Sequence, residues 1–436
     1  MKDKIVKLKN GGVLLYGHTN QCKSSAVEVG FKVGAFVEQK PGTAHLLEHT
    51  LFKKTKNRSN SQVESDRSKI SFLNASTSMD YIVLKFYRTN KMICKTFDFA
   101  FDVLMNSVID DEYFETEKGV VKEELSMCSD SESRDIYVKS FKQAVSKSRS
   151  ALDIVGKTSD NVDKIKFNDL VKFKKKYFVG NNFVCSIVTS LSLWKTKRLV
   201  NKYFSDKISF DEHYKSTKSY YESACIDKPS SLKIYKNKQE KVSVMLSFKV
   251  DASELEIFGK NYNYTFLAKY LSGSQGDLFL KLRNKGLIYR LDCDIASFSN
   301  GSLFNILFET SKEKIKEIVE IIAGEVHRVV IEGVTKEHTE TYKNNLEYYS
   351  DEKLPIKTIS RCHMNLSDYL SFGKIFYLSE HEKKVLRKGI NPEGVKRVAN
   401  EIFNKKGNIY VTVLGDVTNK YVPSLEYFKK KFLIQE

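Results

Sequence analysis

Two histidines and a glutamate lie close together near the amino terminus, in the segment GTAHLLEHTLFKK at residues 42–54. The turn-forming KPGT and a Thr43 that can serve as N-cap predict a helix that begins here. On this helix His45 and His49 are four residues apart, and therefore lie on one face, about one turn from each other. Two imidazoles at this spacing can bind one zinc ion, and Glu48 is close enough to orient or deprotonate a zinc-bound water.

The same residues also fit an ordinary amphipathic helix. The pattern H-x-x-E-H is expected by chance in about one random chain in 100 at this histidine content. Histidines on such helices are usually surface groups or satisfied core groups. The motif by itself therefore leaves both interpretations open.

A catalytic zinc ion needs a third protein ligand, and the segment ETEKGVVKEELSM offers acidic candidates on a predicted helix. Glu117 and Glu124 are seven residues apart, which places them two turns apart on a shared face. Two valines between them predict that one side of the helix is buried, where a glutamate is costly unless it is paired or metal-bound. Glu123 points about 100° away from Glu124 and is expected in solvent.

Together, these motifs resemble the pitrilysin/insulinase/mitochondrial processing peptidase family of inverzincins. The chain has His45-x-x-Glu48-His49, followed after 75 residues by Glu124. Four further segments agree with the family pattern over essentially the whole chain, namely VGAFVEQKPGTAHLLEHTLFKKT, LNASTS, EKGVVKEEL and, in the second half, LFLKLRNKGLIY.

The resemblance implies a zinc endopeptidase that acts on peptides or unfolded segments, with one zinc ion per chain. His45, His49 and Glu124 would bind the zinc. Glu48 would be the general base that activates the water. Glu117 would support the metal site from behind its ligands, where a substitution usually weakens metal binding or activity.

The resemblance also implies a substrate-binding strand and two residues that act on the substrate carbonyl. Asn74, Ala75 and Ser76 would present a strand edge to which the substrate adds as an extra strand. Arg283 and Tyr289 would help to stabilise the tetrahedral oxyanion. Their offset is six residues here and seven in many family members, and the alternative interpretation is a surface arginine and a core tyrosine.

The elements that must position these residues repeat along the chain. Alternating strand patterns at 25–35 and 241–252 are each followed by a helix-length segment and a second strand pattern, at 78–87 and 301–310. A long amphipathic helical pattern then leads, in both halves, to a closing helix and strand. The polar, aperiodic segment 207–232 is the candidate linker.

The same order of elements, met twice, predicts an α+β fold of two tandem homologous domains. Each domain is expected to be a mainly antiparallel sheet flanked by helices. Residues 1–215 would form the zinc-binding catalytic domain, and residues 216–436 a homologous domain that completes the substrate chamber.

The amino-acid composition indicates which broad class of protein this is. Its 436 residues are 41% hydrophobic and 29% charged, which fits a globular protein. No stretch approaches the roughly 18 apolar residues of a membrane span, and the amino terminus has no apolar segment of a secretory signal. We therefore expect a cytoplasmic protein without membrane insertion. The seven cysteines are scattered and never form C-x-x-C, which argues against a disulfide framework or a cysteine zinc site.

The net charge of +18 raises nucleic acid as a partner. The lysines are spread along the chain without a nucleic-acid motif, so a solvated lysine-rich surface is favoured and no nucleic-acid partner is expected. Attraction of acidic or extended peptides is a third explanation of the charge.

Two other functions compete with the peptidase: a basic nucleic-acid-binding protein with an accidental motif, and a non-catalytic family subunit or scaffold. Inactive members usually lose a ligand or the base, and this chain retains all four residues.

Family resemblance also bears on assembly. The complete chamber in this family takes four domains, so a chain with two would need a partner. A homodimer and a heterodimer with a degenerate paralogue both satisfy this requirement, and Arg283 and Tyr289 would then act across the interface. General peptide degradation and maturation of a precursor peptide remain alternatives for the substrate.

Overall fold

The computed structural model divides the chain into two compact units. It describes residues 3–70, 72–129, 132–149, 151–237, 241–273, 276–349, 354–376, 378, 380–404 and 406–434. Unit 1 comprises Met1–Ser131, Arg149–Tyr220 and Glu352–Tyr377, and unit 2 comprises Glu132–Ser148, Tyr221–Asp351 and Leu378–Glu436. The chain thus passes from one unit to the other several times. One passage, between Tyr220 and Tyr221, lies close to the predicted boundary at 215 and 216, which itself stays a prediction.

A six-stranded sheet forms the centre of unit 1, in the order β1-β2-β7-β3-β5-β4. Its strands are β1 (Lys4–Lys7), β2 (Val13–His18), β3 (Ser24–Phe31), β4 (Leu73–Thr77), β5 (Ile82–Thr89) and β7 (Phe183–Thr189). All neighbours are antiparallel except β2 and β7, which run parallel. The apolar, partly β-branched runs VLLYGH and FVCSIVT form central strands that are buried on both faces.

Helices cover both faces of this sheet. On one face, the aromatic and aliphatic side chains of the sheet and helices share a large core that includes Phe31, Leu47 and Phe97. The helices of unit 1 are α1 (Thr43–Leu51), α2 (Asn60–Ser68), α3 (Ile93–Asn106), α4 (Asp111–Ser129), α6 (Ala151–Val155), α7 (Ser159–Asp163), α8 (Phe167–Tyr177), α9 (Leu193–Val200) and α16 (Leu354–Phe372).

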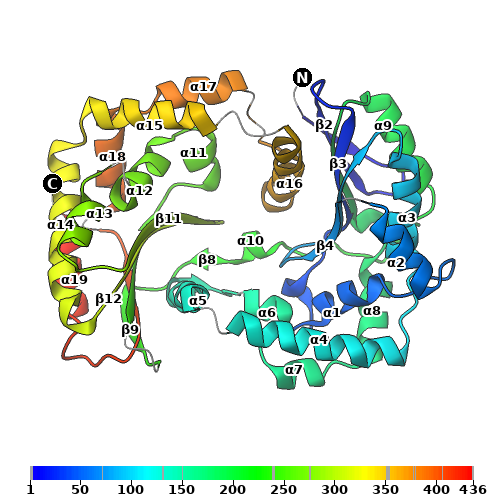
Figure 1. The fold of residues 1–436 in the computed structure, drawn as a ribbon, viewed down its shortest axis with the longest axis horizontal. Helices are drawn as coiled ribbons and strands as arrows, with labels where there is room; N and C mark the ends of the chain where they lie inside the picture. The colour runs from blue at the N-terminus through cyan, green and yellow to red at the C-terminus, as the bar shows by residue number, and fades with distance from the viewer. Residues whose placement is uncertain are drawn as a thin grey trace. The chain divides into compact units, whose positions relative to one another are not determined.

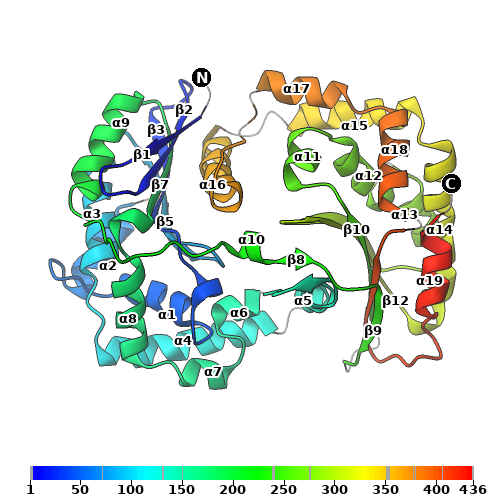
Figure 2. The same ribbon diagram turned by 180° about the vertical axis from the view of Figure 1, so that it is seen from behind.

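The other face of the sheet is covered by α16, a helix from the second half of the sequence, which lies beside β2 and β3 in both views (Figure 1, Figure 2). This face is polar as well as apolar. The Ser186 hydroxyl on β7 donates to the Cys362 carbonyl at 2.7 Å, and His363 Nδ1 lies 3.2 Å from the buried carboxylate of Glu28 on β3. These contacts fix α16 across the sheet.

Unit 2 repeats the arrangement around a five-stranded sheet, in the order β11-β12-β10-β13-β9. Its strands are β9 (Ser231–Tyr235), β10 (Val242–Val250), β11 (Arg290–Phe298), β12 (Gly301–Thr310) and β13 (Ile409–Leu414), with the short pair β6 (Val145–Ser146) and β8 (Cys225–Ile226). Only β13 and β9 pair in parallel within the main sheet. This order matches β4-β5-β3-β7-β2 of unit 1, so the halves share one topology.

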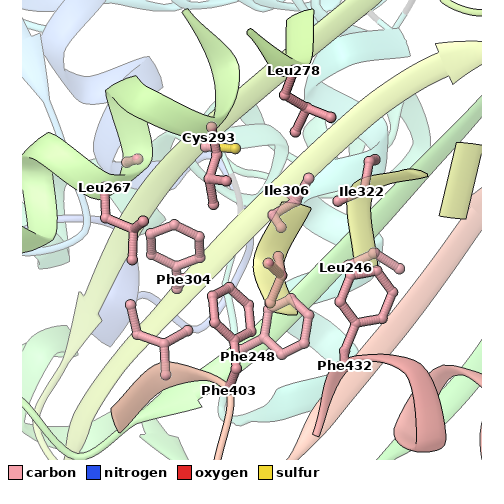
Figure 3. Packing of buried hydrophobic residues seen from close by; sticks show 14 of the residues in the cluster. Leu246, Phe248, Leu267, Leu278, Cys293, Phe304, Ile306, Ile322, Phe403 and Phe432 are labelled. Atoms are coloured by element: carbon pink, nitrogen blue, oxygen red, sulfur yellow. The ribbon is translucent and has the colours of Figure 1, made fainter. Parts of the chain in front are cut away.

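The core of unit 2 packs helices against one face of this sheet. Figure 3 shows Phe248 among Phe403 and Phe432, with ring centroids 4.9 and 5.6 Å from that of Phe248. The helices are α11 (Glu254–Gly259), α12 (Asn263–Ser272), α13 (Leu278–Asn284), α14 (Ile315–Glu332), α15 (Lys336–Tyr349), α17 (Glu380–Lys388), α18 (Pro392–Ile402) and α19 (Leu425–Phe432), and α10 (Tyr220–Ser223) spans the passage between the units.

The opposite face of the second sheet is covered by α5 (Glu132–Ala144), a helix from the first half of the sequence. Ser140 and Ser247 hydroxyls lie 2.9 Å apart, and the Gln143 amide donates to the Thr412 hydroxyl at 2.7 Å. Each half of the chain therefore contributes one helix to the other unit.

The predicted fold class is confirmed: the chain forms two related α+β units, each a mainly antiparallel sheet flanked by helices. Within the described ranges, every helix is too short or too polar to span a bilayer. The six cysteines whose side chains the structure describes are free thiols.

Candidate metal centre and active site

Helix α1, which carries the two histidines, is capped by a side chain from outside the helix. Gly42 is the N-cap and has a φ of 91°, a left-handed conformation that favours glycine. The two carboxyl oxygens of Glu38 accept the Gly42 and Ala44 N–H groups at 2.8 and 2.9 Å. The prediction that Thr43 is the N-cap is wrong: Thr43 is the first helical residue, and its hydroxyl donates to the Lys40 carbonyl at 2.8 Å.

The histidines of α1 and a glutamate of α4 form a cluster with the donors of a zinc site. His45 and His49 have ring centroids 4.6 Å apart. Their Nε2 atoms lie 3.7 and 3.6 Å from the same carboxylate oxygen of Glu124. One ligand atom from each residue lies within 4.8 Å of the others, the only such group among the described residues.

Burial keeps the His45 imidazole neutral, the form that binds a metal. His45 is only 8% exposed, and its Nδ1 is buried without a hydrogen-bond partner among the described residues. Burial, followed by the neighbouring His49, lowers the pKa of His45 to about 4. The imidazole is therefore neutral at pH 7, as a metal ligand must be. Two imidazole nitrogens and one carboxylate fit zinc, and a set of three protein ligands leaves a fourth position open.

Glu117 lies behind His49, where its carboxylate orients the ring. Its Oε2 accepts from His49 Nδ1 at 2.9 Å, and its Oε1 pairs with Lys53 Nζ at 2.7 Å. Burial raises the pKa of Glu117, but the bonds from His49 and Lys53 outweigh burial and leave the pKa lowered. The ionised carboxylate holds the proton of His49 on Nδ1, so the Nε2 lone pair points to the cluster.

The face of α4 that carries the two glutamates is buried at one end and open at the other. Glu117 is 5% exposed, whereas the Glu124 side chain is 42% exposed. Of the two valines between them, Val121 is buried and Val120 is exposed. Glu123 is exposed, as expected from its helical position.

Glu48 is held beside the cluster by β4. The Thr77 hydroxyl donates to Glu48 Oε2 at 2.7 Å. Burial raises the pKa of Glu48, and the side-chain and main-chain hydrogen bonds from Thr77 oppose this by less. Among the described strands, β4 pairs only with β5, so its other edge is open next to Glu48.

The remaining predicted residues fall in two places. Asn74, Ala75 and Ser76 lie on β4, with Asn74 exposed and Ala75 buried. Arg283 lies in the last turn of α13, and Tyr289 just before β11, both in unit 2 and both exposed. Tyr289 is 65% exposed, so it is not a core tyrosine.

Three supporting residues escaped the sequence interpretation. Glu38 and Thr77 stand within the segments that carried the family resemblance, VGAFVEQKPGTAHLLEHTLFKKT and LNASTS, and that position was the available signal. Lys53 also stands within the first of these segments, but its pairing with Glu117 depends on a contact between α4 and the end of α1 that the segment does not indicate.

Comparison with known proteins bears on both halves of the chain. The family model described as "Insulinase (Peptidase family M16)" matches residues 13–152. A second model, "Peptidase M16 inactive domain", matches residues 164–346. The first match contains the cluster.

Several relatives carry names that refer to zinc or to processing. A protein of Rickettsia bellii named as an uncharacterized zinc protease is 24% identical over 411 residues, which cover 92% of this chain and 95% of that protein. A Bacillus subtilis protein named as the uncharacterized zinc protease YmxG is 24% identical over 91% of this chain and 95% of its own length. A Schizosaccharomyces pombe protein named as a probable mitochondrial-processing peptidase subunit beta is 27% identical over 47% of this chain and 45% of its own length.

Solved structures share the fold. A protease from Helicobacter pylori aligns with a TM-score of 0.74 at 21% identity, over 95% of this chain and 99% of that chain. An M16 inactive-domain protein from Pseudomonas fluorescens aligns with a TM-score of 0.76 at 13% identity, over 96% and 99%. The names of the relatives and the His-His-Glu cluster together support one zinc ion per chain.

Proposed function

Because the chain belongs to the insulinase family of peptidases, M16, we propose that it is a zinc-dependent endopeptidase that hydrolyses peptides or unfolded segments of polypeptides. The main observation behind the proposal is that one ligand atom from each of His45, His49 and Glu124 lies within 4.8 Å of the others. Thr77 holds Glu48 beside them. Metal-assisted hydrolysis of a peptide bond requires at least a metal site and an adjacent carboxylate.

His45, His49 and Glu124 would hold a zinc ion, and the ion would supply the Lewis acidity that lowers the pKa of a water and polarises the substrate carbonyl. The chain's own residues do the rest. Glu48 accepts the proton of the attacking water and returns it to the leaving amine, with Oε1 as the accepting oxygen because Oε2 accepts from the Thr77 hydroxyl. Glu117 keeps His49 oriented throughout.

The substrate binds by adding a strand to the open edge of β4. Main-chain pairing of this kind accepts many sequences, because the hydrogen bonds do not depend on the side chains. The edge of β4 that pairs with no other described strand, and its closeness to Glu48, support this mode. A cleaved peptide would therefore be bound in an extended conformation.

Arg283 and Tyr289 are proposed to stabilise the oxyanion, in this chain or in a partner. Their exposed side chains are free to meet a substrate, and the aromatic hydroxyl and guanidinium are both donors. The expected effect of Arg283→Ala or Tyr289→Phe is a fall in kcat with zinc content unchanged.

Assembly and biological role belong to the same proposal. We propose a two-chain enzyme, either a homodimer or a heterodimer with a paralogous subunit. The name "subunit beta" of the processing-peptidase relatives supports a second chain. The cleavage products of the enzyme would distinguish precursor maturation from general degradation. The cytoplasmic location stays a prediction.

The test is cleavage of a peptide library, read by mass spectrometry, with the chain alone and with any adjacent paralogue. Glu48→Gln should keep stoichiometric zinc and lose about 10²–10⁴-fold in rate. Glu123→Gln, the same change at an exposed position of α4, is the matched control. Zinc-loaded wild type that cleaves nothing in any pairing would favour a non-catalytic subunit, and salt-sensitive gel shifts with DNA or RNA would favour the nucleic-acid alternative.

A further inference from the structure

We infer that Thr77 is a positioning residue, which holds Glu48 at the open edge of β4 and ends the pairing of an added substrate strand at Ala75. The inference rests on the proposed function and extends it to the register of the substrate. Its basis is the direction in which each residue of β4 points its main chain.

Two hydrogen bonds fix that direction. Ser78 N–H donates to the Tyr81 carbonyl at 2.9 Å, and Tyr87 N–H donates to the Phe72 carbonyl at 3.3 Å. Phe72 and Ser78 therefore point their main-chain groups towards β5. The register between them is continuous, from Leu73 opposite Phe86 to Thr77 opposite Ile82.

In an antiparallel ladder, the residues that bond to the neighbouring strand alternate with residues that face away from it. Asn74 and Ser76 consequently bond to β5, like Phe72 and Ser78. The main-chain groups of Leu73, Ala75 and Thr77 point to the open edge. Of the three residues predicted to present this edge, Ala75 is the one whose N–H and carbonyl are turned outward.

Glu48 occupies the end of this row. The Thr77 hydroxyl donates to Glu48 Oε2 at 2.7 Å, which holds the carboxylate against Thr77. The carboxylate therefore stands beside the outward N–H of Thr77, where an added strand would have to pair. The Ala75 N–H is bonded only to the side chain of its own neighbour, Asn74 Oδ1, at 3.0 Å, a contact that a substrate carbonyl can replace.

An added strand can therefore pair at Ala75 but not at Thr77. Outward groups recur every second residue, about 6.6–6.8 Å along the strand. The next substrate peptide beyond the Ala75 pair accordingly lies beside Glu48 and not against the β4 main chain. Thr77 in this way fixes which peptide bond of an extended substrate reaches the base.

The hydroxyl of Thr77 also fixes the base itself. With Oε2 bonded to Thr77, Oε1 of Glu48 is the oxygen left to take a proton. Without this bond, the side chain can rotate away. A displacement of about 1 Å in a reacting group costs about 10²-fold in rate, so we expect kcat to fall about 10–100-fold when the hydroxyl is removed.

The test compares Thr77→Val and Thr77→Ser in the zinc-loaded protein, on one extended peptide that wild type cleaves at a single bond. Thr77→Val should lower kcat about 10–100-fold, with KM and zinc content within about twofold of wild type. It should also release the Thr77 N–H for pairing, and so add cuts two residues away from the normal site. Thr77→Ser keeps the hydroxyl and should restore kcat and the single cut.

Thr89→Val, the same change at an exposed position of the neighbouring strand β5, is the control and should behave like wild type. The inference is overturned if Thr77→Val keeps the wild-type kcat and cleavage site, or if Thr77→Ser is as impaired as Thr77→Val. It is also overturned if Thr77→Val loses its zinc while Thr77→Ser keeps it, since Thr77 would then support the metal. Failure of wild type to cleave any peptide would instead count against the proposed function.

Discussion

Replacing Glu117 by glutamine tests whether the carboxylate behind His49 sets the affinity for zinc. Glu117 is 5% exposed and uses both oxygens, one for His49 Nδ1 at 2.9 Å and one for Lys53 Nζ at 2.7 Å. A glutamine side chain has the same shape but a single acceptor oxygen. Either His49 or Lys53 must then face the NH₂ group of the glutamine, which cannot accept a hydrogen bond.

The expected size of the effect follows from that lost bond. A hydrogen bond to a charged group contributes about 1.5–3 kcal/mol. If His49 loses its acceptor, the ring is free to turn and to carry its proton on Nε2, where a proton blocks the metal. Loss of such a supporting partner typically raises the metal dissociation constant about 10–100-fold. That range corresponds to about 1.4–2.7 kcal/mol of binding free energy.

Competition for zinc against a chromophoric chelator measures the dissociation constant directly. Thermal unfolding with and without zinc gives a second measure, because the stabilisation by a ligand grows with the logarithm of its concentration over the dissociation constant. Glu117→Gln should lose zinc-dependent stabilisation, while Glu123→Gln, on the exposed side of the same helix, should keep it. A dissociation constant within twofold of wild type would refute the reasoning. A variant destabilised equally with and without zinc would show that Glu117 supports the fold and not the metal.

Two further predictions concern the stability of the protein. Burial raises the pKa of Glu38 from 4.5 to about 8, against the lowering effect of the Ala44 and Gly42 N–H groups. Between these pH values Glu38 is protonated in the folded state and ionised in the unfolded state. Its contribution to the unfolding free energy is therefore complete below pH 4.5 and is lost as the pH rises through about 8. In urea unfolding of zinc-free protein, wild type should lose stability relative to Glu38→Gln over this range, and a constant difference would contradict the assignment. Gly324→Ala, inside α14 with open space around the added Cβ, should raise the unfolding free energy by about 0.5–1 kcal/mol. The same change at Gly42, where φ is 91° and the added Cβ would lie 2.9 Å from Gly156 Cα, should lower it by more than about 1 kcal/mol, and equal effects at both sites in thermal unfolding would contradict both assignments.

The metal cluster could be predicted because its geometry is largely local. The i, i+4 spacing places His45 and His49 on one face of any helix, and the structure finds their rings 4.6 Å apart. The seven-residue spacing likewise placed Glu117 and Glu124 on one face of α4. Spacing could not show that the face is closed at Glu117 and open at Glu124, because that difference depends on what α1 and Lys53 place against it.

Strands and their order were also accessible, whereas the exchange of helices between the units was not. The patterns at 241–252 and 301–310 became β10 (Val242–Val250) and β12 (Gly301–Thr310). An amphipathic helix requires some apolar surface, and its sequence does not say which sheet provides it. The choice of α5 for unit 2 depends on matched polar contacts such as Ser140 with Ser247 and Gln143 with Thr412, more than 100 residues apart along the chain.

The edge of β4 shows most clearly what the sequence leaves open. The segment LNASTS indicates a strand near the metal, but side-chain patterns do not determine which of its residues turn their main chain outward. A shift of one residue in pairing reverses every direction in the strand. With such a shift, Asn74 and Ser76 would face the open edge, and the Thr77 N–H would be used within the sheet. The observed register, set by Ser78 with Tyr81 and by Thr77 with Ile82, is therefore what brings Thr77 to Glu48. Substrate register and base orientation depend on one pairing, so a variant that shifts the β4–β5 hairpin by one residue should lose cleavage while α1 and its zinc ligands remain in place.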